Sequence, residues 1–238
     1  SEQGALIEPL SVGLQSLYSN MPQERDKVLI IGSGVIGTMV LKALRALDLD
    51  CSVAVADPSE YAAELARKAG ADNVIVDKNI PSAAVELTGA VSHKPMMGAN
   101  LLMGGFDRIY DTVGSPGTLN TAMRCLKAGG TLSQVGIWRD VKLDLTPLWL
   151  KQQTLKGVYG CGYATYKDAW MHMFDIALDL VQEGKVELGD FITHRFKLDD
   201  FEEMIELDLK YVRRSSLYFD AQILCRTVGV VLTGKGAY

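Results

Sequence analysis

The sequence predicts an α/β protein whose strands form a doubly wound parallel sheet. Its short apolar runs have the length of strands and no polar face, which is typical of strands covered by helices on both sides. Amphipathic segments with helical spacing lie between these runs, as expected when right-handed crossovers join parallel strands. With 238 residues, of which 48% are hydrophobic, the chain can bury the core that such a fold needs.

The chain opens with a predicted helix and then alternates between strands and helices. Pro9 suits the first turn of a helix, which we expect over residues 9–18 with its leucines on one side. The apolar runs of strand length lie at 27–31, 52–56, 73–76, 107–113, 131–135 and 154–159. Between the first three runs, the helical spacing of apolar residues predicts helices over 35–47 and 60–69.

The pattern changes in two parts of the chain. Residues 80–105 are rich in glycine and methionine, and they predict a helix followed by a loose loop over the sheet edge. From residue 164 the strand–helix alternation ends, and a long amphipathic helix is predicted over 166–183. A strand, a helix capped by aspartates and a last strand are then expected at 191–198, 199–209 and 227–232.

Composition argues against several classes of function. The net charge is −5 and no basic run stands out, so neither nucleic acid nor a membrane is an expected partner. Nothing resembles a signal peptide, and no apolar stretch approaches the ~20 residues that span a bilayer. The four cysteines and three histidines are scattered, which predicts reduced thiols in a cytoplasmic protein and no metal site of local spacing.

The segment IIGSGVIG carries the clearest functional signal. Gly32, Gly34 and Gly37 fit the G-x-G-x-x-G pattern, which here follows a predicted strand and opens a predicted helix, as the motif requires. The first glycine permits a tight turn, the second lets a diphosphate approach the backbone, and the third lets helix and strand pack closely. Val35 and Ile36 open the helix, whose free N–H groups favour phosphate. These residues predict a dinucleotide-binding turn.

Asp57 is the second signal, because it ends the second predicted strand twenty residues after Gly37. A carboxylate at this position accepts hydrogen bonds from the ribose of adenosine and repels a 2′-phosphate. No arginine follows before Arg67, so we expect NAD rather than NADP as the cofactor. An alternative interpretation is that the glycines only tighten a turn and Asp57 only caps the next helix.

Two later turns follow the fourth and fifth predicted strands, in the segments DTVGSPG and QVGIW. Ligands of such sheets bind beyond the carboxyl ends of the strands, where the strand order reverses. We therefore expect backbone contacts to the cofactor from Thr112, Val113, Gly114, Val135, Gly136 and Ile137. Alternatively, the glycines in these segments only shape the turns.

Several segments in this order resemble the medium-chain dehydrogenases of the zinc-containing alcohol, sorbitol and threonine dehydrogenase type. They are GALIEPLSVGLQSL, KVLIIGSGVIGTMVLKALRAL, ELARKAGADNVI, FDRIYDTVGSPGTLNTAMRCLKAGGTLSQVGIW and ITHRFKLDDFEEMIEL. The resemblance implies a Rossmann-type domain and NAD(P)-dependent oxidation of a small alcohol or polyol, with zinc polarising the carbon–oxygen bond. It also implies that Glu8 lies at the catalytic zinc, as a ligand or near neighbour.

The family's catalytic domain, with its cysteine and histidine zinc ligands, has no counterpart in these segments. The resemblance therefore implies a linker helix from that domain over 1–22, the dinucleotide-binding domain over 23–163, and a segment returning to the catalytic domain over 164–238. We expect such a chain to bind NAD, to be inactive alone and to hold no zinc, and the sequence identifies no catalytic residue. The apolar faces of the two outer segments would be exposed or would contact other copies. Family members associate through the last strand of the sheet, which implies a homo-oligomer.

Two other functions remain open. A binding-only module would hold NAD, or no ligand, and would perform no turnover. An S-adenosylmethionine methyltransferase also uses a glycine-rich turn and an acid on the second strand. Those enzymes carry an acid at the end of the first strand, whereas VLII has none.

Overall fold

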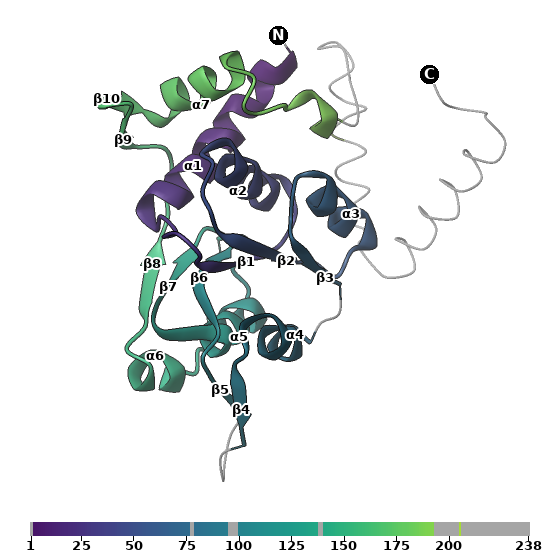
Figure 1. The fold of residues 1–238 in the computed structure, drawn as a ribbon, viewed down its shortest axis with the longest axis vertical. Helices are drawn as coiled ribbons and strands as arrows, with labels where there is room; N and C mark the ends of the chain where they lie inside the picture. Colours follow the sequence, from purple (N-terminus) through teal and green to yellow (C-terminus); the bar gives the residue numbers. More distant parts are fainter. Residues whose placement is uncertain (1, 77–78, 95–99, 138–139, 193–204, 206–238) are drawn as a thin grey trace, which may run out of the picture. The chain divides into compact units, whose positions relative to one another are not determined.

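The computed structural model describes residues 2–76, 79–94, 100–137, 140–192 and 205. Within these ranges, six strands form one parallel sheet in the order β3-β2-β1-β6-β7-β8 (Figure 1). Their bounds are β1 Lys27–Ile31, β2 Ser52–Ala56, β3 Asn73–Ile75, β6 Phe106–Asp111, β7 Leu126–Gln134 and β8 Thr154–Gly157. The strand order reverses between β1 and β6, which confirms the doubly wound fold.

Helices cover both faces of the sheet, as Figure 1 shows. One face carries α1 (Ile7–Ser19), α2 (Val35–Ala46) and α3 (Glu60–Lys68), and the other carries α4 (Ile80–Thr88), α5 (Pro116–Cys125) and the short α6 (Thr146–Leu150). The central strand β1 is buried on both faces, since Val28, Leu29, Ile30 and Ile31 have almost no exposed surface. This burial explains why the strands read as continuous apolar runs.

The first helix is buried within the chain itself, and this corrects the expectation of an exposed or intermolecular apolar face. A short 3₁₀ helix, Glu2–Leu6, leads into α1, which packs on α2 and on α7 (Met173–Gln182). Leu10, Leu14 and Leu17 are fully buried, and so are four residues of α7, namely Met173, Ile176, Ala177 and Leu180. Gly13 permits the close approach, because a Cβ there would lie 2.7 Å from the backbone carbon of Met39.

The long helix predicted over 166–183 is wrong in its first part, where the structure has a β-hairpin. β9 (Tyr163–Tyr166) and β10 (Ala169–His172) pair antiparallel, and only then does α7 begin. Lys167 and Asp168 form the two-residue turn with φ of 48° and 64°. Positive φ at both central positions matches the twist of a tight hairpin and is incompatible with a continuous helix.

Residues 80–105 contain more regular structure than the loose loop that was expected. The predicted helix is present as α4 and ends at Gly89, which has a φ of 74°. β4 (Val91–His93) and β5 (Leu101–Met103) then form an antiparallel pair, and Leu102 is buried in the core. Because a two-stranded ribbon buries few residues, its apolar pattern is too short to stand out in sequence.

Contacts divide the chain into two compact units, Ser1–Gly189 and Asp190–Tyr238, and the sheet with its covering helices belongs to the first. The strand expected at 191–198 begins in a 3₁₀ turn, Gly189–Phe191, and its residues from 193 on lie outside those described. The helix expected at 199–209, apart from residue 205, and the strand expected at 227–232 also lie outside them. The domain boundaries drawn from the resemblance stay predictions.

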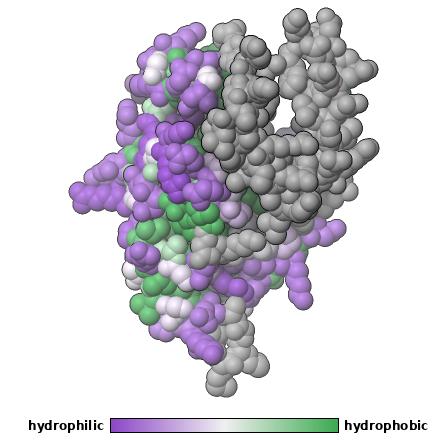
Figure 2. Space-filling model, turned by 90° about the vertical axis from the view of Figure 1, so that its right-hand side faces the viewer, coloured by the Kyte–Doolittle hydropathy of each residue, from purple (hydrophilic) through white to green (hydrophobic). Residues whose placement is uncertain are grey.

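Among the residues coloured by hydropathy in Figure 2, hydrophilic ones predominate and hydrophobic ones form smaller patches between them. Among the helices in the described ranges, none has the length and apolar character needed to cross a membrane.

Candidate functional site

The glycine turn between β1 and α2 is shaped by close backbone approach. Gly32 has a φ of +90°, and a Cβ there would lie 2.7 Å from Thr112 Oγ1 and 2.8 Å from Val113 Cγ2. A Cβ on Gly37 would lie only 1.9 Å from the carbonyl oxygen of Gly32. Both positions therefore require glycine, as the motif predicts for the tight turn and for the packing of helix on strand.

Gly34 has the opposite environment, because a Cβ there would meet no atom within 4 Å. It is exposed and is the N-cap of α2, yet no side chain caps this helix. The caps of α3, α4 and α5 differ, since Ser59, Asn79 and Ser115 each accept a backbone N–H there. The first turn of α2, at Val35 and Ile36, thus begins beside open space and lacks the side-chain oxygen that would satisfy its N–H groups.

Asp57 follows β2 and links it to the glycine turn. Its Oδ2 accepts a hydrogen bond from the N–H of Ser33 at 2.8 Å, and its Oδ1 accepts one from the N–H of Ser59 at 2.9 Å. The side chain is half-buried, and each carboxylate oxygen keeps a lone pair for a further donor. The carboxylate is therefore held in place by the backbone while it stays available to a ligand.

A cleft of about 560 Å³ lies beyond the carboxyl ends of β1 and β2. Gly32 and Asp57 line it together with Val113, Ser115 and Thr118. Two predicted groups that are 25 residues apart in sequence thus face the same space. A cleft at the point where strand order reverses is where doubly wound sheets bind ligands.

The turns after β6 and β7 pack against each other. A Cβ on Gly114 would lie 2.6 Å from the carbonyl carbon of Gly136, and one on Gly136 would lie 2.3 Å from that of Val113. Thr112 supports the glycine turn, because its hydroxyl donates to the carbonyl oxygen of Ile31 at 2.9 Å. These contacts explain the small residues in both turns.

Of the six residues expected to contact the cofactor through their backbone, five have an N–H that is already bonded within the chain. That of Thr112 donates to Ile31, those of Val113 and Gly114 donate to the side chain of Asp111, and those of Val135 and Gly136 donate to its carbonyl oxygen. Of the six residues expected from these turns, Val113 lines the cleft, and Ile137 is 89% exposed. The two turns therefore offer carbonyl groups and apolar side chains to a ligand.

Asp111 is the residue that sequence reasoning missed. It ends β6, is fully buried, and accepts four backbone hydrogen bonds through its side chain and carbonyl oxygen. Burial raises the pKa of Asp111 above its usual value, and hydrogen bonds from the N–H of Gly114, the side chain of Thr118 and the N–H of Val113 offset only part of this rise. The available signal was an acid at the end of an apolar strand, directly before the turn DTVG.

The described residues do not form a zinc site. Glu8 is exposed in the first turn of α1, and within the described ranges no three His, Cys, Asp or Glu side chains are grouped so as to hold a metal ion. Zinc sites in proteins use three or four such ligands. The role of Glu8 at a metal stays a prediction.

Comparisons with known proteins place the chain in a family. The family model described as zinc-binding dehydrogenase matches residues 35–175, which is more than half of the chain. The L-idonate 5-dehydrogenase of Vitis vinifera is 31% identical over 209 residues, which cover 86% of this chain and 52% of the relative. The (R,R)-butanediol dehydrogenase of Bacillus subtilis is 29% identical over 203 residues, covering 85% of this chain and 52% of the relative.

Solved structures agree on the fold. The crystal structure of the B. subtilis butanediol dehydrogenase aligns with a TM-score of 0.69 and 25% identity, covering 90% of this chain and 55% of that one. A zinc-binding dehydrogenase from Sinorhizobium meliloti, bound to NADP, aligns with a TM-score of 0.68 and 24% identity, covering 85% and 55%. This chain spans about half the length of the relatives that it matches. It belongs to the zinc-binding dehydrogenase family.

Proposed function

We propose that this chain is the dinucleotide-binding part of an NAD-dependent alcohol or polyol dehydrogenase. The observation that carries the proposal is that Gly32 and Asp57 line one cleft, while α2, which begins three residues after Gly32, has an uncapped start. A cleft of this kind at the strand reversal fits a dinucleotide, which needs backbone donors for its diphosphate and an acceptor for its ribose.

Successive groups along the sheet match successive parts of the cofactor, namely the diphosphate, the adenosine ribose and the nicotinamide half. The first turn of α2 offers N–H groups and a partial positive charge to the diphosphate, which reaches the backbone because Gly34 has no side chain. The free lone pairs of Asp57 accept hydrogen bonds from the adenosine ribose. The nicotinamide half then lies over β6 and β7, and the cofactor supplies the acceptor for a hydride from the substrate.

NAD is the proposed form of the cofactor. A 2′-phosphate would meet the carboxylate of Asp57, and like charges at contact distance repel. Arg67 does not offset this repulsion, because its guanidinium is engaged by Glu60 and Glu64, both at 3.1 Å. The fold alone does not select the form, since the S. meliloti neighbour is bound to NADP.

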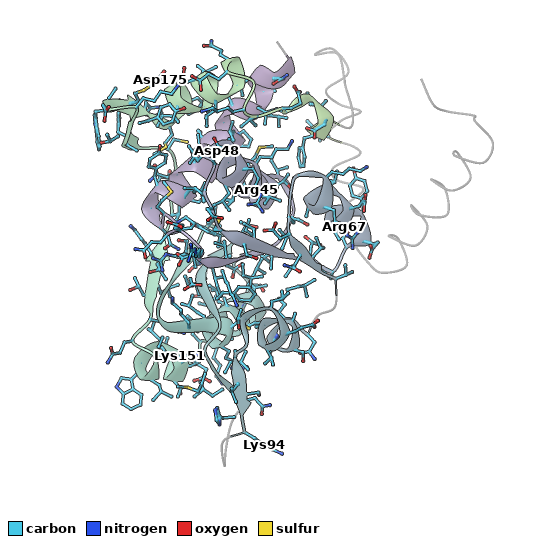
Figure 3. The ribbon with its side chains drawn as sticks, viewed as in Figure 1. Arg45, Asp48, Arg67, Lys94, Lys151 and Asp175 are labelled. Carbon is cyan, nitrogen blue, oxygen red and sulfur yellow. The ribbon has the colours of Figure 1, made fainter. Side chains whose placement is uncertain are left out.

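Measurements of cofactor affinity test the proposed contact between Asp57 and the adenosine ribose. Asp57→Asn keeps one acceptor for the backbone but removes the charge, so we expect NAD affinity to fall about tenfold and the preference for NAD over NADP to shrink. Calorimetric titration with NAD and NADP measures both. Asp48→Asn is the matched control, because Asp48 is exposed just beyond the far end of α2 (Figure 3), and this variant should bind as the wild type does.

Two outcomes would contradict the proposal. If the wild-type chain binds neither dinucleotide, the site is not a cofactor site. If Asp57→Asn leaves both affinities unchanged, the carboxylate does not contact the ribose.

The substrate is proposed to be a small alcohol or polyol, because the relatives are named for idonate and butanediol. The described residues do not form a metal cluster, which favours binding without turnover by this chain alone. The test incubates the chain with NAD and sorbitol, L-idonate or butanediol, with and without added zinc, and follows the absorbance of the reduced nicotinamide. We expect no reduction, and reduction of NAD by any polyol would contradict the binding-only behaviour.

We also propose that copies associate in the cytoplasm through the open edge of the sheet. β8 is the last strand on its side and pairs only with β7 among the described strands. An unpaired edge is a template for pairing with a second chain. Light scattering over a range of protein concentrations tests this, and a strict monomer at high concentration would contradict it.

A further inference from the structure

Two groups of exposed apolar side chains lie at the two ends of the open edge strand β8. The first, called here the α6 patch, comprises Leu145, Trp149 and Leu150. The second, called the hairpin patch, comprises Tyr159, Tyr163 and Trp170. All six side chains are between 47% and 96% exposed. Figure 1 shows α6 at one end of β8 and the β9–β10 hairpin at the other.

The edge of β8 lacks a common protection against pairing with a second chain. Many edge strands carry a lysine whose charge keeps other strands away. Lys156 of β8 does not act in this way, because its Nζ donates to the carbonyl oxygen of Ser19 at 2.7 Å and is held toward the end of α1. The edge is therefore open to a second β8.

The symmetry of such a pair determines what each patch meets. Most homodimers have a two-fold axis, so both copies use the same surface. Two hydrogen-bonded strands related by a two-fold axis run antiparallel, which places the start of one strand beside the end of the other. The α6 patch of each copy therefore comes next to the hairpin patch of the other copy.

The two patches are complementary in shape. A cleft of about 510 Å³ opens in the hairpin patch, and its walls include Tyr159, Tyr163 and Trp170 beside residues of β8 and α1. The rings of Tyr163 and Trp170 are stacked with an angle of 10° between their planes, which orders one wall of this cleft. Trp149 on the short α6 is 78% exposed. A tryptophan that fills an aromatic cleft is a frequent anchor of protein interfaces.

We propose that this chain forms a two-fold dimer in which Trp149 of each copy occupies the cleft in the hairpin patch of the other. The proposal rests on the proposed association through β8 and names the side chains that carry it. β8 has only four residues, whereas a stable interface buries about 800 Å² on each partner. The four aromatic side chains of the two patches, with about 150–250 Å² each, offer on the order of 500–750 Å² of exposed area per copy.

The test exchanges charges between the two patches. Trp149→Glu and Tyr159→Lys each place a charge in the proposed contact, and each should raise the dissociation constant of the dimer at least about tenfold. In a mixture of the two variants, one contact of the mixed dimer pairs opposite charges and the other keeps both wild-type side chains. Dimers should therefore reappear in the mixture. Sedimentation velocity over a range of protein concentrations measures all of these samples.

Tyr61→Lys is the matched control for Tyr159→Lys. Tyr61 is also an exposed tyrosine, but it lies on α3, which packs on β2 and β3 at the other edge of the sheet. Its substitution should leave the dissociation constant of the dimer unchanged. Trp170→Lys is a second variant of the hairpin patch and should give the same results as Tyr159→Lys, alone and in the mixture. Circular dichroism checks that each variant is folded.

Three results would overturn the proposal. A wild-type chain that stays monomeric forms no such dimer, and a dimer that both single variants leave intact uses another surface. A mixture of the variants that stays monomeric shows that the two patches do not meet. Calorimetric titration of the same samples with NAD tests the proposed cofactor site separately, because the residues that line its cleft belong to neither patch.

Discussion

Gly34 and Gly37 stand three residues apart in one turn, yet only Gly37 is needed for folding. Gly37 lies against the carbonyl oxygen of Gly32, so no side chain fits between helix and strand. Gly34 faces open space and has an ordinary φ of −66°, so the fold does not require glycine there. A glycine without a structural reason, at the start of an uncapped helix, is best explained by a ligand that approaches its backbone.

The two glycines should therefore respond differently to alanine. We expect Gly34→Ala to change the free energy of unfolding by less than about 1 kcal/mol but to weaken NAD binding at least about tenfold. Gly37→Ala should lower the free energy of unfolding by about 3 kcal/mol or more, because backbone atoms must move. Urea unfolding and calorimetric titration of both variants check this. Wild-type NAD affinity in Gly34→Ala would show that no diphosphate lies over Gly34.

The β9–β10 hairpin is the element that departs most from its sequence pattern. Its turn residues Lys167 and Asp168 are both left-handed. The Nζ of Lys167 donates a hydrogen bond to Asp179, which lies in α7, at 2.7 Å. It also donates to Glu183, the residue directly after α7, so the turn is linked to the helix that follows. The rings of Tyr163 and Trp170 stack across the two strands, with centroids 6.1 Å apart. These side-chain contacts thus stabilise a left-handed turn, a conformation that glycine adopts more readily than lysine or aspartate.

Glycine at the second turn position should stabilise this hairpin. We expect Asp168→Gly to raise the free energy of unfolding by about 0.5 kcal/mol, because the left-handed conformation costs glycine nothing. Asp175→Gly is the matched control, since Asp175 lies in the first turn of α7 (Figure 3) and glycine there should lower stability by about 1 kcal/mol. Urea unfolding measures both changes. Destabilisation by Asp168→Gly would contradict the tight-turn assignment.

At the scale of the whole molecule, a buried lysine after α6 connects that segment to the end of α5 and the start of β7. Lys151 follows α6 (Figure 3), and its Nζ donates to the carbonyl oxygens of Arg124, at 2.7 Å, and Leu126, at 2.6 Å. These carbonyl groups flank the end of α5, where a cation is favourable. Burial nevertheless lowers the pKa of Lys151 to about 8 and raises that of the neighbouring Cys125 to about 12.

These two groups give the stability a pH dependence with a defined sign. Above pH 8 the folded chain releases the proton of Lys151 while the unfolded chain, with a pKa of 10.5, keeps it, so stability rises. Above pH 9 the unfolded Cys125 ionises while the folded thiol does not, so stability falls. We expect a gain of about 1 kcal/mol between pH 7 and pH 9, which then levels off or reverses.

Urea unfolding at pH 7, 8, 9 and 10 checks this dependence. Lys151→Met is the comparison, because its side chain is apolar and similar in length and cannot titrate. The variant should show no rise between pH 7 and pH 9. A wild-type stability that stays flat over this interval would contradict the shift assigned to Lys151.

The parts predicted best from sequence are those set by local geometry. β1 and β2 have the predicted bounds, because a strand buried on both faces leaves an uninterrupted apolar run. The turn at Gly32, Gly34 and Gly37 was predicted because backbone sterics act within a few residues. The hairpin at Lys167 was missed, since neither turn residue is the glycine or asparagine that marks such turns.

The sequence by itself determined the fold class, the glycine turn and the acid that follows the second strand. Only the tertiary structure decided that Asp57 faces the same cleft as Gly32 and that α1 packs against α2 and α7. It also decided that Asp111 accepts hydrogen bonds from the N–H groups of the turns after β6 and β7. The physical reason is the range of the interactions. Periodicity and backbone conformation are local, whereas burial and hydrogen-bond partners depend on residues that the fold brings from elsewhere in the chain.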